Sequence, residues 1–146
     1  MPLDPIDLPS VPRRPPQDSC RVIGGEQPVE RLGFVDSLAQ LYGRVRVVCC
    51  PLLNGGGTRL KLIEGAAHGK PMVSTRVGAE GLTFADGTEI LLRDDDAGFA
   101  EACVRLIHDD ALCRTLGGAA RAKAIQDYRI DSIQEHIVRL LRGAAA

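Results

Sequence analysis

The sequence has no run of apolar residues long enough to cross a bilayer, which would take about 18–20 in succession. Its opening segment, MPLDPIDLPSVPRRPP, has no uninterrupted apolar core, so we expect no secretory signal peptide there. The formal net charge is only −1, which gives no bulk attraction to nucleic acid or to an anionic membrane. We therefore expect a cytoplasmic protein without an integral membrane segment that does not bind nucleic acid.

The five cysteines contain no C-x-x-C pair, the spacing common in zinc and redox sites. Cys49 and Cys50 are adjacent in an apolar segment, and neighbouring side chains of a strand point to opposite faces. We therefore predict free thiols in a reducing compartment rather than a disulfide framework. The run Asp94–Asp96 could form a metal site, but it is better explained as the N-cap of a helix on a solvated turn. We expect neither a metal nor a cofactor.

The prolines gather in the first 19 residues, so we interpret 1–19 as a Pro-rich tail or linker. We expect the folded domain over 20–131. Residues 132–146 are predicted to be a C-terminal amphipathic helix and tail, because Ile133, Ile137 and Leu140 share one helical face. There is no internal repeat.

Short β-prone segments alternate with helical patterns along the chain. Strands are predicted at 21–23, 32–35, 44–50, 72–75 and 89–92, and helices at 36–42, 58–68, 94–108, 110–128 and 132–142. This alternation predicts an α/β fold in which a Rossmann-like parallel sheet is flanked by helices. No G-x-G-x-x-G motif follows the first predicted strand, which disfavours a dinucleotide-binding protein.

The segment NGGGTRLKLIEGAAHGKP, which begins at Asn54, carries the main functional signal. Glycines let a backbone approach a ligand closely, and the first amides of a helix lack internal partners. A glycine-rich turn before a helix is therefore a candidate phosphate site. The competing interpretations are a flexible turn and, for Arg59 and Lys61, ordinary solvated helix charges.

Several blocks resemble the C-terminal domain of glycosyltransferase family 4, the group 1 transferases with the two-domain GT-B fold. In order they are GFV, DSLAQLY, GGGTRLKLIEGAAHGKPMVSTRVGAEGL and EILLRDDDAGFAEAC, and they extend over about 22–128. The resemblance implies the C-terminal, donor-binding half of a GT-B fold. It also implies transfer of a sugar from a UDP-, GDP- or ADP-sugar to an acceptor, with retention at the anomeric carbon and usually without a metal.

The resemblance also implies a donor-binding site. Its residues would be Gly55, Gly56, Gly57, Thr58, Arg59, Lys61 and Glu64. The glycines and Thr58 would face the phosphates, Arg59 and Lys61 match the family's RLK, and Glu64 matches the second glutamate of its E-x7-E pattern. That glutamate typically accepts hydrogen bonds from the ribose hydroxyls. The position of the first glutamate holds Gly56, so the sugar must be bound by other groups, and the catalytic residues stay unknown.

The family's N-terminal domain, and the basic pair that clamps the pyrophosphate, have no match in this sequence. We therefore expect a truncated enzyme without turnover of its own, which would be active only if a partner chain, or the missing half, supplies the N-terminal domain. Two alternatives stay open. One is a non-catalytic nucleotide-binding module, and the other is a structural remnant that self-associates as a homodimer through an exposed sheet edge or helix.

Overall fold

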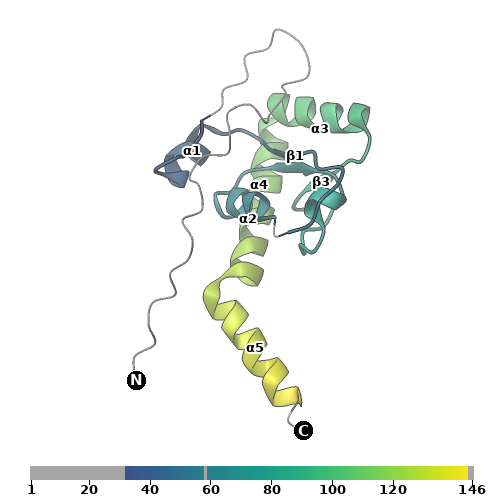
Figure 1. The fold of residues 1–146 in the computed structure, drawn as a ribbon. Helices are drawn as coiled ribbons and strands as arrows, with labels where there is room; N and C mark the ends of the chain where they lie inside the picture. The colour runs from purple at the N-terminus through teal and green to yellow at the C-terminus, as the bar shows by residue number, and fades with distance from the viewer. Residues whose placement is uncertain (1–31, 58, 145–146) are drawn as a thin grey trace. The chain divides into compact units, whose positions relative to one another are not determined.

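The computed structural model describes residues 32–57 and 59–144 (Figure 1). The chain divides between Asp36 and Ser37 into two units. Of the first unit, only 32–36 is described, and it contains no helix or strand. The strand predicted at 32–35 is therefore wrong. Leu32 and Phe34 are exposed, Phe34 to 89%, so this segment lacks the packing that would stabilise a strand. The strand predicted at 21–23 lies outside the described residues.

The second unit is built on a sheet of three parallel strands in the order β1-β2-β3, which are β1 (Val48–Cys50), β2 (Met72–Ser74) and β3 (Leu91–Leu92). Val48 lies opposite Met72, and Val73 opposite Leu91. The predicted parallel sheet is confirmed. Each strand is shorter than its sequence pattern, because only two or three residues of each strand find a ladder partner.

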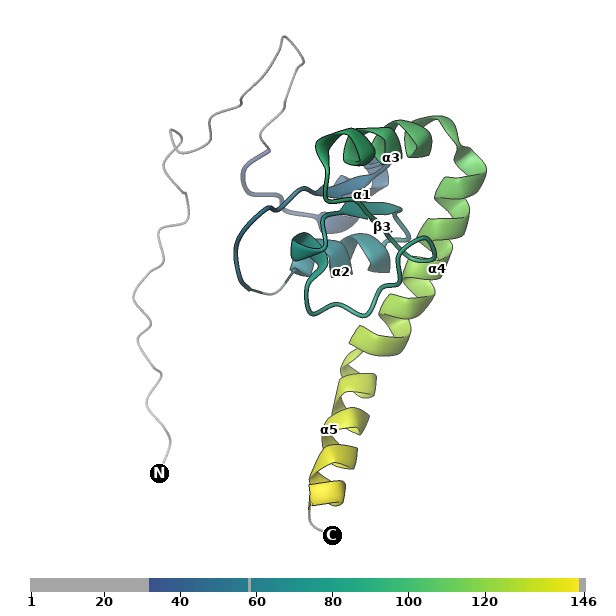
Figure 2. The ribbon, with the colours of Figure 1, turned by 90° about the vertical axis from the view of Figure 1, so that its right-hand side faces the viewer.

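The helices are α1 (Leu38–Arg44), α2 (Leu60–Ala67), α3 (Asp96–His108), α4 (Asp110–Tyr128) and α5 (Ile130–Ala144), with a short 3-10 helix η1 (Val77–Ala79). Helices α2 and α3 cover opposite faces of the sheet (Figure 2). Cys50 and Met72 pack with Leu62 of α2, whereas Val73 and Leu91 pack with Leu106 of α3. This alternation is what a strand with both faces buried requires.

Helix α4 contributes to both cores. Leu116 lies in the core under α3, and Ala120 and Ala124 lie in the core under α2. The crossing is close at Gly117, where an added Cβ would meet the carbonyl oxygen of Gly69 at 2.1 Å. Gly69 has φ +69° and follows the C-cap of α2, His68. Because Gly69 precedes β2, α4 packs near the amino end of that strand.

Side-chain caps fix where three of the helices begin. The Asp95 carboxylate accepts from the Gly98 amide at 2.7 Å, and that of Asp109 accepts from the Leu112 amide at 2.8 Å. Both caps satisfy amides that have no partner inside the helix, and the predicted extents of α3 and α4 are confirmed. Ser37 caps α1, which therefore begins at Leu38, two residues after the predicted start at 36.

Helix α5 begins at Ile130, two residues before the predicted start, because Arg129 leaves the helical region (φ −68°, ψ 146°) and ends α4. Ile130, Ile133 and Ile137 on α5 are exposed to 73%, 44% and 49%. Within 32–57 and 59–144, no helix combines the length and the apolar character that crossing a membrane requires.

Candidate functional site

The glycine-rich loop follows β1 at the carboxyl edge of the sheet, where open α/β sheets bind their ligands. Gly55 and Gly57 have φ of +123° and +104°, a region that favours glycine. Leu53–Gly57 is exposed, and its backbone amides donate to no described residue. Together with the start of α2, the loop therefore offers unpaired N–H groups to solvent. Thr58, the next predicted site residue, lies outside the described residues.

Arg59 does not extend into solvent from the start of α2. It is 7% exposed, and its guanidinium donates to three backbone carbonyls. The acceptors are Gly56 at 3.1 Å, Gly55 at 2.8 Å and Val77 at 3.1 Å. The Nε–H is buried and has no acceptor in the described part of the chain. Arg59 therefore fastens the loop to η1, a role that sequence spacing could not reveal.

Lys61 and Glu64 lie on α2 beyond the loop. Lys61 is exposed, and Glu64 is half-buried. The hydroxyl of Tyr42, on α1, lies 3.3 Å from the Lys61 carbonyl oxygen and 3.4 Å from Glu64 Oε2. Burial raises the pKa of Tyr42, and the Glu64 carboxylate raises it further, so the phenol keeps its proton. One oxygen of Glu64 thus faces Tyr42, and no contact with a described residue occupies the other.

Lys61, Glu64 and His68 share one face of the helical pattern of α2, at spacings of three and four residues. Tyr42 covers part of this face, because its ring stacks on His68 with centroids 4.7 Å apart and planes inclined by 14°. His68 is the C-cap of α2. The structure therefore brings Gly55, Gly56 and Arg59 together directly, and places Glu64 beside Tyr42.

A cavity of about 180 Å³ lies at the carboxyl edge of the sheet. Its walls are Pro51, Leu53, Thr75, Arg93, Asp94, Asp95, Asp96, Phe99 and Ala100. Gly55–Gly57 and Glu64 do not line it. Sequence reasoning missed Thr75 and Arg93. Their place in the sequence could have identified them, because each directly follows a strand and so lies at the edge where parallel sheets bind ligands.

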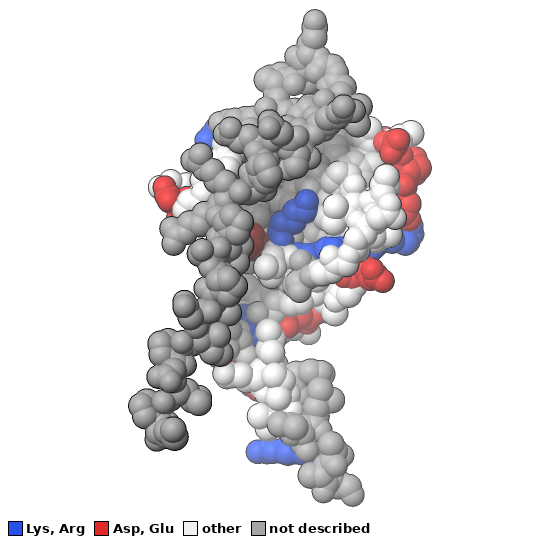
Figure 3. Space-filling view, in the orientation of Figure 1, with Lys and Arg blue, Asp and Glu red and all other residues white. Residues whose placement is uncertain are grey.

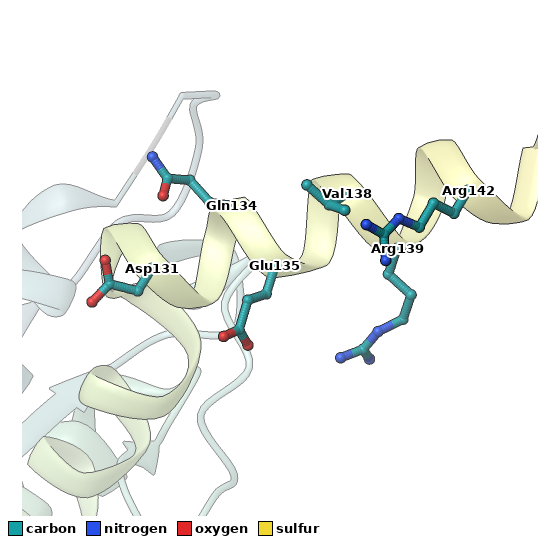
Figure 4. A pocket seen from close by; sticks show the side chains of 6 residues that line it. All are labelled: Asp131, Gln134, Glu135, Val138, Arg139 and Arg142. Carbon is teal, nitrogen blue, oxygen red and sulfur yellow. The ribbon is translucent and has the colours of Figure 1, made fainter.

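A second hollow, of about 530 Å³, lies along α5, away from the predicted donor residues. Figure 4 shows its wall, with the acidic side chains in the first turns of the helix and the arginines nearer its end. The lining residues are Asp131, Gln134, Glu135, Val138, Arg139 and Arg142. All six belong to one helix.

The aspartates before α3 have structural partners. Asp94 accepts from the Arg76 amide at 2.7 Å and pairs with its guanidinium at 2.5 Å. These contacts lower the pKa of Asp94, the amide contributing most. Asp95 is the N-cap of α3, as predicted for this run. Among residues 32–57 and 59–144, no three His, Cys, Asp or Glu side chains are placed to hold a metal ion.

The four described cysteines are free thiols, as predicted, and Cys20 lies outside the described residues. Cys50 is buried, whereas the Cys49 Sγ lies 3.6 Å from that of Cys103 on α3. Although part of Cys49 is exposed, its sulfur faces this partner. Burial, and then Cys103, raise the pKa of Cys49 to about 12. A thiol of this pKa is a poor nucleophile at neutral pH.

The surface carries charges of both signs. Figure 3 shows Lys and Arg side chains within the face it draws, and Asp and Glu side chains mainly along its margin. This distribution agrees with the small net charge of the sequence. Two cationic residues follow the loop, Arg59 at the N-cap of α2, which is buried, and Lys61 on α2, which is exposed.

The fold and the loop define a class, an α/β domain with a Rossmann-like parallel sheet and an open glycine loop before a helix. Residues 11–109 match the family model described as glycosyl transferases group 1. The chain belongs to this glycosyltransferase family.

The comparison with curated proteins gives a relative in Mycobacterium leprae (strain TN), a phosphatidyl-myo-inositol mannosyltransferase. It is 30% identical over 118 residues, which cover 78% of this chain and 31% of the relative. The chain thus matches about a third of the length of that protein. No solved structure matches the chain.

Proposed function

We propose that this chain is the donor-binding domain of a retaining glycosyltransferase and that it binds a UDP-, GDP- or ADP-sugar. The observation that carries the proposal is the exposed loop Leu53–Gly57, whose amides have no acceptor in the described chain. These amides, with the positive end of α2, suit the diphosphate of such a donor. Exposed Lys61 adds a mobile positive charge.

Glu64 is proposed to bind the ribose. A carboxylate suits a diol because both of its oxygens accept hydrogen bonds, and Tyr42 faces Oε2 only. Glu64 lies on α2 one turn beyond the start of the helix, so the diphosphate and the ribose of one nucleotide would bind in succession along α2. Leu53 of the loop lines the cavity of about 180 Å³, whereas Gly55–Gly57 and Glu64 do not line it.

We further propose that the isolated chain lacks turnover. Catalysis in a two-domain transferase requires an acceptor-binding domain that closes on the donor and excludes water. The chain covers 31% of its curated relative, which supports the assignment of the acceptor side to another domain or chain. The free thiols support a reducing, cytoplasmic location.

Calorimetric titration of the purified chain with UDP, GDP and ADP tests the proposal. We expect binding in the millimolar range or tighter for at least one nucleotide, and weaker binding of its 2′-deoxy form. Glu64→Gln should reduce this preference for ribose, whereas Glu101→Gln, an exposed site on α3, should not. Absence of heat with all three nucleotides would reject donor binding, and sugar transfer by the chain alone would reject the lack of turnover.

A second candidate is a structural remnant that self-associates. The exposed apolar residues Ile130, Ile133 and Ile137 of α5 favour self-association. Covering such an apolar face with a second copy of the chain removes it from water, which is favourable. Light scattering across a concentration series separates the two candidates. A concentration-dependent dimer without nucleotide binding supports the remnant, and a monomer that binds nucleotide supports the donor domain.

A further inference from the structure

We infer that Arg59 is a positioning residue. It holds the backbone of the glycine loop in a conformation that binds an anion, and it does not itself contact the donor. This inference rests on the proposed function, since it assigns the anion to the diphosphate of the donor. It revises the role that the family resemblance gives to the arginine of the RLK sequence.

The first support is the direction of the guanidinium. Its two terminal nitrogens bind the carbonyl oxygens of Gly55 and Gly56, at 2.8 and 3.1 Å. In a glycine-rich segment, whose backbone has many accessible conformations, fixing two successive carbonyls removes most of that freedom. With these carbonyls held toward Arg59, the loop amides stay unpaired, and a preorganised set of donors binds an anion more tightly than a mobile one.

The second support is the third acceptor. The Val77 carbonyl, which binds Arg59 at 3.1 Å, belongs to η1 after β2. The loop itself follows β1, and the two strands pair directly. One side chain therefore connects the two segments that leave adjacent strands at the same edge. A lysine lacks the planar fork of two terminal nitrogens that this arrangement uses, because its donors all belong to one ammonium nitrogen.

The third support is electrostatic. Arg59 is 7% exposed, yet it forms no ion pair with an acidic side chain in the described residues. Its three partners in the described part of the chain are neutral carbonyls, and its buried Nε–H has no acceptor there. Burial of an uncompensated cation is unfavourable. An anion bound by the amides of the same loop would supply the missing negative charge.

The competing explanation is that Arg59 contacts the ligand directly. The two explanations predict different anion affinities for the Arg59→Lys variant. If Arg59 touches phosphate, Arg59→Lys keeps a point charge and part of the affinity, while Arg59→Met loses both. If Arg59 acts through the Gly55 and Gly56 carbonyls, lysine and methionine fail alike. The ligand-free loop should also become mobile in both variants.

The experiment is an NMR titration of the ¹⁵N-labelled full chain with inorganic pyrophosphate. In the wild type we expect shifts of the Gly55, Gly56 and Gly57 amide signals. In Arg59→Lys and Arg59→Met we expect a fall in pyrophosphate affinity of at least about tenfold and lower order parameters at Gly55 and Gly56 without ligand. Arg46→Lys is the matched control, because Arg46 pairs with Asp110 instead.

The possible results distinguish a failure of the positioning role from a failure of the proposed function. Wild-type binding with unchanged affinity in both Arg59 variants overturns the positioning role and leaves donor binding intact. Affinity retained by lysine but lost by methionine overturns it in favour of direct contact. A wild type that binds neither pyrophosphate nor any nucleoside diphosphate rejects the proposed function, and the positioning role with it. A folded spectrum outside the loop shows that each variant is intact.

Discussion

The ring of Tyr42 lies against the imidazole of His68, with centroids 4.7 Å apart and planes within 14° of parallel. Tyr42 belongs to α1 and His68 caps the end of α2, so this contact joins two helices that are distant in sequence. Tyr42 is 6% exposed and also packs in the core that contains Leu62 and Ala66. Tyr42, the buried residue of α1, therefore joins α1 to α2.

Two substitutions of Tyr42 distinguish the contribution of its ring to stability from that of its hydroxyl. We expect Tyr42→Ala to lower the free energy of unfolding by about 3–5 kcal/mol, as for other buried aromatic side chains. Tyr42→Phe keeps the stacked ring and loses only two long hydrogen bonds, so its cost should stay below about 1.5 kcal/mol. Urea denaturation of both variants measures the difference. Equal losses would show that the hydroxyl, not the ring, carries the stability.

Gly117 and Gly118 form a matched pair on α4. A Cβ at Gly117 would meet the Gly69 carbonyl oxygen at 2.1 Å, whereas nothing lies within 4 Å of one at Gly118. Gly117→Ala should therefore destabilise the chain by about 1–3 kcal/mol through overpacking. Gly118→Ala should stabilise it by about 0.5–1 kcal/mol because alanine favours the helix. Thermal unfolding of the two variants checks the opposite signs, and a stable Gly117→Ala would contradict the close crossing.

The parts of the fold that depend on residues close together in the chain could be predicted from the sequence. The limits of α3 and α4 follow from the caps Asp95 and Asp109, which act within their own helix. Strand limits depend on partners elsewhere in the chain, so 44–50 shortened to Val48–Cys50 and the strand at 32–35 did not form. The open loop could be predicted from its glycines. The inward turn of Arg59 could not, because its third acceptor, Val77, lies 18 positions away in the sequence.

The ion pair of Asp94 with Arg76 predicts an acid-sensitive contribution to stability. The pKa of Asp94 in the folded protein is lower than its ordinary value of 3.8. Its contribution is therefore complete above about pH 4 and is lost as the pH falls through the lower, folded value. Asp94→Asn should reduce the dependence of the urea midpoint on pH below 4. Asp36→Asn, which removes a charge without this partner, is the control, and identical pH profiles for Asp94→Asn and wild type would contradict the prediction.

The raised pKa of Cys49, about 12, predicts slow alkylation. At pH 8 we expect iodoacetamide to label Cys49 in the folded chain at least about tenfold more slowly than in urea, because only the thiolate reacts. Cys103→Ala removes the neighbouring thiol that raises this pKa and should accelerate the labelling. Timed quenching and peptide mass spectrometry measure both rates. Rapid labelling of folded Cys49 would show that its sulfur is not held against Cys103.

The conformation of the glycine loop can be tested by adding a single methyl group at two neighbouring positions. Gly57 has φ +104°, and Gly56 has no positive φ, while neither has a described atom within 4 Å of an added Cβ. Gly57→Ala is therefore strained by its backbone alone, which costs about 1–3 kcal/mol, whereas Gly56→Ala is not strained.

If the loop binds the diphosphate in this conformation, Gly57→Ala should weaken UDP, GDP or ADP binding by relaxing the loop into another shape. Gly56→Ala should leave the free energy of unfolding within about 0.5 kcal/mol of the wild type. Calorimetric titration and urea denaturation of the two variants supply the readouts. Equal stability and equal nucleotide affinity in both would mean that the left-handed turn at Gly57 is not what presents the amides, because alanine would then occupy that position without strain.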